Sequence, residues 1–139
     1  MRVLAIDYGR VRIGLAITDM NQTIAYPFKT VNAVNNFEKT SQNLLDAIKD
    51  NIDEIEKIII GLPLLLKGGF SNMTNEVTEF VKIFKTKTNI PIELLDERLS
   101  SIEAERHLKE NLKLNRKKRS KKIDPIAATI LLQNFLNLN

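Results

Sequence analysis

The sequence lacks cysteine and tryptophan, and it has a single histidine among 139 residues. Without cysteine, the chain can form no disulfide, no thiolate zinc site and no cysteine nucleophile. The histidine, His107, lies beside Leu108 in a predicted helix, where the spacing favours a surface or packing role over a catalytic base. Aromatic residues make up only 6% of the chain, which argues against a dedicated single-strand nucleic-acid binder, because such proteins need stacking platforms.

Long hydrophobic runs are absent as well. No apolar run reaches the ~18 residues that a membrane-spanning helix needs, and the N-terminal run ends at Asp7, too early for a signal peptide. We therefore expect a cytoplasmic protein without membrane partners. The hydrophobic fraction of 43%, the charged fraction of 27% and the length fit one globular domain over residues 1–139.

Positive charge is concentrated in one segment. Ten Lys or Arg and three Glu lie from Arg98 to Lys122, so this segment has a charge of +7. The net charge of the chain is +4, so the rest of the chain has a charge of −3. Six of the seven residues 116–122 are cations. Such a run suits a polyanion such as nucleic acid, although a solvated surface loop has the same composition.

Three strands are predicted in the first third of the chain. The apolar run from Val3 to Ile6 is typical of a central strand buried on both faces, and apolar residues alternate from Ile13 to Ile17 along a second strand. Because the intervening turn is short, these two strands should form an antiparallel hairpin. A third strand near Ile24 to Val31 contains Pro27, which places it at a sheet edge.

Helices and strands alternate in the rest of the chain. The predicted elements are a helix at about Asn36 to Asp50, a strand at Lys57 to Gly61, a helix around Met73 to Phe84, a strand at Ile90 to Leu95, a helix opening with Ser100 and Glu103, and a last helix from about Pro125. Strands joined through helices are usually parallel, so the fold class is α/β with a five-stranded mixed sheet flanked by helices.

Carboxylates follow two of the predicted strands and precede the last helix. Asp7 ends the first strand before a glycine turn, Asp96 and Glu97 end the fifth, and Asp124 stands before Pro125. Since sites form where the carboxyl ends of neighbouring strands diverge, these acids are expected to converge. Each also has a simpler reading: turn hydrogen bonds, pairing with a neighbouring arginine, or helix capping.

Converging carboxylates without cysteine or paired histidine favour a hard divalent cation, Mg²⁺ or Mn²⁺. Two such ions, roughly 4 Å apart, would activate the attacking water and stabilise the leaving oxygen in phosphodiester hydrolysis. Four cations near the acids would then face the phosphates of a nucleic acid: Arg12, Arg98, Lys121 and Lys122. The residues therefore suggest a metal-dependent nuclease.

Four short motifs, in register over nearly the whole chain, resemble the YqgF/RuvX family. They run from Ala5 to Gly14, Ile60 to Leu64, Leu95 to Ser100 and Lys121 to Ala128. The resemblance implies a ribonuclease H-like fold and a cytoplasmic nuclease, similar to Holliday junction resolvases, that processes the 5′ end of pre-16S rRNA in ribosome biogenesis. It maps the acidic motif positions, both catalytic and metal-binding, onto Asp7, Glu97 and Asp124, with Asp96 adjacent.

The chain departs from the family pattern at Leu65 and Lys67, after the Gly-Leu-Pro motif, and at Pro125. These departures bear on substrate contacts in that loop and on a capping role for Asp124. Two other functions stay open: a resolvase of four-way DNA junctions, which usually needs a dimer, and a non-catalytic RNA-binding factor in ribosome assembly. The sequence does not distinguish a monomer from a dimer.

Overall fold

The computed structural model describes residues 1–64, 69, 71–96 and 116–138, with only the backbone of residues 116–124. The described elements are β1 (Arg2–Asp7), β2 (Arg12–Thr18), β3 (Ala25–Asn32), α1 (Phe37–Ile48), a short 3₁₀ turn η1 (Ile52–Glu54), β4 (Ile55–Leu62), α2 (Asn72–Lys85), β5 (Ile92–Asp96) and α4 (Arg116–Leu138). The predicted helix that opens with Ser100 and Glu103 lies outside the described residues.

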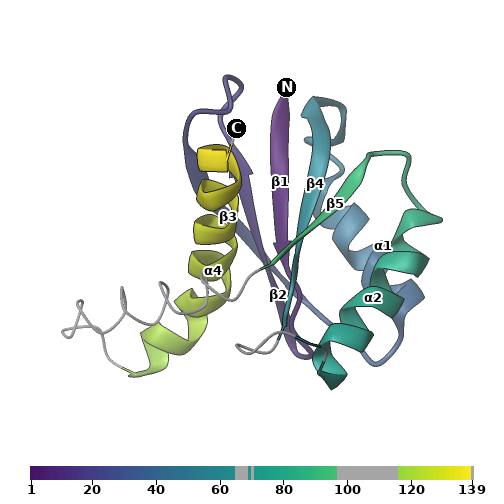
Figure 1. Ribbon diagram of the computed structural model, residues 1–139. Helices are drawn as coiled ribbons and strands as arrows, with labels where there is room; N and C mark the ends of the chain where they lie inside the picture. The colour runs from purple at the N-terminus through teal and green to yellow at the C-terminus, as the bar shows by residue number, and fades with distance from the viewer. Residues whose placement is uncertain (65–68, 70, 97–115, 139) are drawn as a thin grey trace.

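The five strands form one mixed sheet in the order β3-β2-β1-β4-β5. The pairs β1/β2 and β2/β3 are antiparallel, whereas β1/β4 and β4/β5 are parallel. Helices α1 and α2 cover one face, and α4 covers the other (Figure 1). The predicted hairpin, mixed sheet and flanking helices are therefore confirmed.

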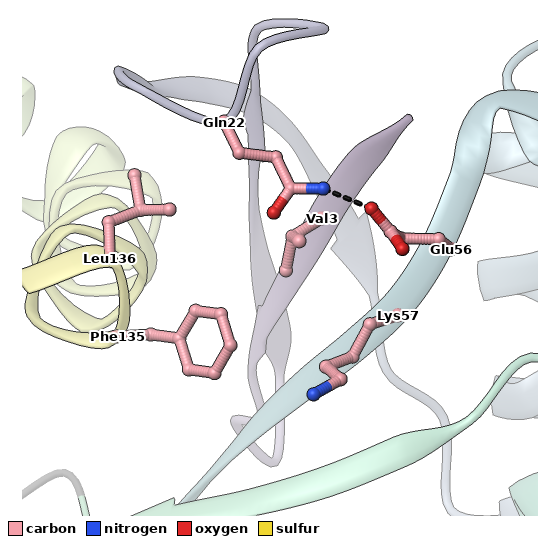
Figure 2. Close-up of a pocket in the computed structure, with 6 residues that line it drawn as sticks. All are labelled: Val3, Gln22, Glu56, Lys57, Phe135 and Leu136. Atoms are coloured by element: carbon pink, nitrogen blue, oxygen red, sulfur yellow. Dashed lines mark hydrogen bonds between the residues drawn. The ribbon is translucent and has the colours of Figure 1, made fainter. Parts of the chain in front are cut away.

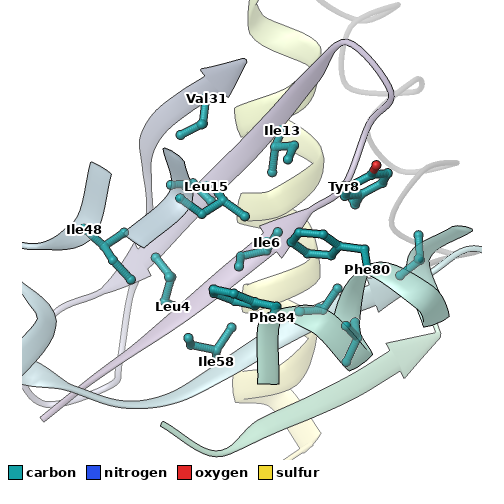
Figure 3. Close-up of a cluster of buried hydrophobic side chains, with 14 of the residues drawn as sticks. Leu4, Ile6, Tyr8, Ile13, Leu15, Val31, Ile48, Ile58, Phe80 and Phe84 are labelled. Atoms are coloured by element: carbon teal, nitrogen blue, oxygen red, sulfur yellow. The ribbon is translucent and has the colours of Figure 1, made fainter. Parts of the chain in front are cut away.

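Strand β1 is buried on both faces because helices pack on both sides of it. Leu4 and Ile6 belong to the larger hydrophobic cluster, which includes Phe80 and Phe84 of α2 (Figure 3). Val3 and Ala5 alternate with them and pack with residues of α4. This alternation explains the continuous apolar run, since a strand covered on both faces has no position for a polar side chain.

Strand β3 lies at an edge of the sheet, as Pro27 predicts. A proline nitrogen cannot donate to the strand ladder, so an edge position avoids the loss of a central hydrogen bond. The pairing of β2 with β3 shifts register between Leu15 and Ala16, directly before the Ala16–Pro27 pair.

The start of α2 is fixed to the end of β4. Ser71 and Thr74 form a reciprocal capping box, and the Thr74 hydroxyl donates a hydrogen bond to the carbonyl oxygen of Pro63. The Ser71 cap thereby satisfies a backbone N–H that the first helical turn leaves without a partner. This tie places the N-terminus of α2 beside the sheet edge at which β4 ends.

The prediction that the last helix begins at Pro125 is wrong, because α4 begins at Arg116 and contains Pro125 in its interior. Lysine and arginine are good helix formers, so the basic run extends the helix before the proline, at the cost of one backbone hydrogen bond. Asp124 is therefore not an N-cap. Among the described helices, none combines the length and hydropathy that crossing a membrane requires.

Candidate functional site

The parallel strands β1, β4 and β5 all end at the same edge of the sheet. Ile6 pairs with Ile60, and Ile60 pairs with Leu94, so Asp7, Gly61 and Leu95 occupy the same level one residue further along. Asp96 ends β5 one residue beyond that level. The edge carries two of the predicted strand-end acids, Asp7 and Asp96.

Asp7 lies on the face of the sheet that α4 covers. It alternates with Ile6, which packs on the opposite face, and so shares a face with Val3 and Ala5. Its antiparallel partner is Gly14, which is buried and has no side chain. The space beside the Asp7 carboxylate is thus bounded by backbone on the β2 side.

Arg12 shares this face with Asp7. It lies two residues before Gly14, so it is the diagonal neighbour of Asp7 across the hairpin, and such neighbours have Cα atoms roughly 7–8 Å apart. The structure therefore brings together Asp7 and one of the four predicted phosphate-binding cations. A cation at this position can bind a phosphate group, whereas the neighbouring carboxylate can approach that phosphate only through a bridging metal ion.

Asp96 lies on the other face. Leu95 packs against the cluster that contains Val3 and Ala5, so Asp96, the next residue, faces away from Asp7. Its side chain is exposed. The strand-end acid that the family resemblance treats as adjacent is thus separated from Asp7 by the sheet.

The other predicted site residues cannot be placed in this way. Glu97 and Arg98 lie outside the described residues. Lys121, Lys122 and Asp124 belong to α4, which packs on β1 and β2, but only their backbone is described. In the part of the chain whose side chains are described, no three acidic or histidine side chains gather closely enough to bind a metal ion.

The turn between β1 and β2 is held in place by its first two residues. The Tyr8 ring is buried, with its centroid 4.9 Å from that of Phe80 and 6.5 Å from that of Phe37. A Cβ atom at Gly9 would overlap the carbonyl oxygen of Arg12, so only glycine permits this close approach.

Burial raises the pKa of the Tyr8 hydroxyl; the Glu76 carboxylate adds to this effect and the Arg10 guanidinium opposes it. The phenol consequently stays neutral at physiological pH. Arg10 itself donates from Nε to Glu76 Oε2 at 2.8 Å, which joins the turn to α2. The sequence gives no sign of this pair, because its two residues lie 66 positions apart.

A pocket of about 330 Å³ lies at the opposite end of the sheet, lined by Val3, Gln22, Glu56, Lys57, Phe135 and Leu136 (Figure 2). Its polar groups already have partners. Gln22 donates to Glu56, and Lys57 pairs with Glu93 at 3.1 Å. Because it lies near the starts of β1 and β4, this pocket is separate from the edge that carries Asp7.

Comparisons with known sequences agree on one family. Residues 1–138 match the family model described as "RuvX: Holliday junction resolvase". A relative from Protochlamydia amoebophila is 44% identical over 98% of this chain and 93% of its own length, and one from Maridesulfovibrio salexigens is 41% identical over 98% of both. Both relatives are named "Putative pre-16S rRNA nuclease".

Solved structures establish the fold. Thermus thermophilus RuvC in complex with a Holliday junction substrate superposes with a TM-score of 0.55 at 12% identity, covering 99% of this chain and 94% of RuvC. A ROK hexokinase from the same organism gives 0.52 at 22% identity but is covered over only 38% of its chain. At these identities the likeness concerns the fold alone, which is ribonuclease H-like as the resemblance predicts.

Proposed function

Because the chain belongs to the RuvX family, we propose that it is a nuclease that hydrolyses phosphodiester bonds at the 5′ end of precursor 16S rRNA, in the cytoplasm. The relatives' name supports the RNA substrate. The observation that carries the proposal is the position of Asp7: it ends a central strand, shares a face with Arg12 and faces a glycine across the hairpin. β2 therefore places no side chain directly opposite this carboxylate.

Asp7, Glu97 and Asp124 are the proposed catalytic residues. The alternation along β5 argues against Asp96, because Leu95 shares the face of Asp7 and Asp96 therefore lies on the other face, and the motif resemblance assigns the role to Glu97. Position 124 lies one helical turn before Ala128, which packs on Val3 and Ala5. The structural evidence for both acids therefore comes from neighbouring residues, Leu95 and Ala128, that the structure describes.

The chemistry of this donor set fits a divalent cation. Asp7, Glu97 and Asp124 offer carboxylate oxygens only, the ligands that Mg²⁺ and Mn²⁺ prefer, and Gly14 places no side chain opposite Asp7. When bound, a pair of such ions supplies water activation and stabilises the leaving oxygen. Arg12 binds a phosphate of the nucleic acid on the α4 side of the sheet edge. Arg98, Lys121 and Lys122 bind further phosphates along the nucleic-acid strand.

Cleavage assays with matched variants test this function. We would offer the protein, with Mg²⁺ or Mn²⁺, an RNA that spans the 5′ end of pre-16S rRNA and, separately, a four-way DNA junction. Asp7→Asn removes the charge and nearly keeps the shape. Asp53→Asn makes the same change at an exposed residue of η1, which directly precedes β4 and so lies at the opposite end of the sheet from Asp7. We expect RNA cleavage by the parent and by Asp53→Asn, and none by a folded Asp7→Asn protein.

The family's description favours one second candidate, a resolvase of DNA junctions. Cleavage of the junction, and not of the RNA, in an Asp7-dependent manner would establish that function instead. If neither substrate is cut but the parent and Asp7→Asn bind RNA equally well, the carboxylates are structural. The protein would then be an RNA-binding assembly factor.

A further inference from the structure

Arg10 has a binding capacity that its contact with Glu76 does not use. The Nε atom donates to Glu76 Oε2 at 2.8 Å, and the side chain is 61% exposed. A guanidinium has five N–H donors. Of those of Arg10, only the Nε–H forms a hydrogen bond within the described part of the chain. The two terminal amino groups remain available to a ligand with several acceptor oxygens.

The position of this guanidinium is well defined. The buried Tyr8 ring packs against Phe80, and the backbone of Gly9 lies close to the Arg12 carbonyl group, so the turn is fixed to the core. The Glu76 carboxylate binds the guanidinium itself. Exposed ion pairs contribute little to stability because water and salt screen them, so the Arg10–Glu76 pair does little for the fold. It does orient an arginine at the sheet edge that carries Asp7.

Arg10 and Arg12 lie on opposite sides of the same turn. Arg12 shares the face of Asp7 and α4, whereas Arg10 reaches α2 on the other face. The first turn of α2 carries no acidic residue, and its N-terminus has the positive end of the helix dipole. A polyanion that passes from Asp7 across the tip of the turn would therefore meet an arginine on each side, Arg12 on one and the Glu76-paired Arg10 on the other.

We propose that Arg10 contacts a second phosphate of the nucleic-acid strand, on the α2 side of the β1–β2 turn, while Glu76 orients its guanidinium. The strand then crosses the tip of the turn, with one phosphate at Asp7 and Arg12 and a neighbouring phosphate at Arg10. This inference rests on the proposed nuclease function. It adds a substrate contact that neither the motif spacing nor the charge distribution of the sequence indicates.

Binding is measured separately from cleavage, by fluorescence anisotropy of the labelled pre-16S RNA segment in EDTA over a series of NaCl concentrations. Arg10→Gln should weaken binding roughly fivefold and make the slope of log Kd against log salt shallower by about one counterion. Arg10→Lys keeps the charge and should keep the slope. In cleavage assays, Arg10→Gln should raise KM and leave kcat nearly unchanged.

Two further variants separate this role from a structural one. Lys82→Gln removes a similarly exposed cation from α2, the helix that carries Glu76; Lys82 pairs with Glu79 at 3.2 Å, and the variant should leave binding unchanged. Glu76→Gln keeps an acceptor oxygen for Arg10 and removes a negative charge from the strand's path, so binding should be at least as tight as in the parent. A purely structural tie predicts instead that Arg10→Gln and Glu76→Gln weaken binding alike.

The inference is overturned if Arg10→Gln binds with the parent's affinity and salt slope, or if it is no weaker than Lys82→Gln. That result leaves the nuclease proposal intact as long as the parent cuts RNA and Asp7→Asn does not. Failure of the nuclease proposal appears differently, as a parent protein that does not cleave the RNA. The two failures therefore give distinct results in the same set of variants.

Discussion

Asp7 is paired directly with Gly14 across the β1–β2 hairpin. Directly opposed residues of an antiparallel pair point to the same face, with Cβ atoms about 4.5–5.5 Å apart when both residues have one. Any side chain at position 14 would therefore stand next to the Asp7 carboxylate. Gly14 is the one β2 position that places no side chain on the sheet, so nothing on β2 stands directly opposite the Asp7 carboxylate.

A valine at position 14 should reduce catalysis. Valine favours strands, but Gly14 is buried, so Gly14→Val crowds the face that carries Asp7 at some cost in stability, and its methyl groups occupy space that the proposed substrate phosphate or cation needs. We expect cleavage to fall on the order of 100-fold, the cost of a small misplacement in an active site. The measurement is kcat/KM on the RNA, with circular dichroism to verify folding.

Thr30→Val is the matched control for that substitution. Thr30 pairs with Gly14 from the β3 side and is exposed, so the variant also adds valine to the sheet but does so away from Asp7. It should cleave like the parent. Equal activity of Gly14→Val and Thr30→Val would show that the space beside Asp7 serves neither a phosphate nor a cation.

Gly9 should tolerate no side chain. Because a Cβ atom there overlaps the Arg12 carbonyl oxygen, Gly9→Ala must displace the backbone of the turn, at a cost of roughly 1–3 kcal/mol in the free energy of unfolding. Urea unfolding measures this cost. Val11→Ala, which changes a 72% exposed side chain in the same turn, should unfold at nearly the parent's urea concentration. Equal midpoints for both variants would contradict the close approach.

The sequence predicts the strands better than the end of the chain, for a physical reason. Burial on both faces leaves a continuous apolar run in β1, and Pro27 marks an edge, so local residues suffice for both predictions. The last helix is different, since Asp124 and Pro125 together imitate a helix start. Helix-forming lysines and arginines before them extend α4 instead, which no local signal at the proline reveals.

The candidate site is only partly accessible to the same reasoning. Parallel pairing follows from the helical connections, so the shared edge of Asp7 and Asp96 can be predicted. The face on which each acid lies cannot, because it depends on register and on where α4 packs. The Arg10–Glu76 contact is harder still, since it joins a turn to a helix 66 residues away.

Acid should destabilise the protein partly through Asp19. Its carboxylate accepts hydrogen bonds from Ile24 N at 3.0 Å and from Thr23 Oγ1 and N, both at 2.7 Å, and these bonds, that from Ile24 most of all, lower its pKa to about 2 from an ordinary 3.8. Since the folded pKa is the lower one, the unfolded chain binds this proton first. The contribution to stability is present above pH 3.8 and is lost as the pH falls through about 2.

Thermal unfolding between pH 5 and pH 2 measures this effect. Asp19→Asn should show a shallower fall in Tm over that range than the parent, because its amide does not titrate. Thr23→Val removes one donor to the charged carboxylate and should raise the pKa of Asp19, so that its Tm begins to fall at a higher pH. Parallel curves for the parent and Asp19→Asn would show that the turn does not couple to folding.

The two acids at the end of β5 should differ in their effect on cleavage. Leu95 packs with Val3 and Ala5 on the face of Asp7, so Asp96 faces away, and Glu97 is the acid that the family resemblance assigns to the catalytic set. We therefore expect Glu97→Gln to abolish RNA cleavage and Asp96→Asn to retain nearly all of it. Both variants neutralise one charge at adjacent positions, so each serves as the other's control. Should Asp96→Asn be the inactive one, β5 must present its acids in the opposite register, and the proposed ligand set would change to Asp7, Asp96 and Asp124.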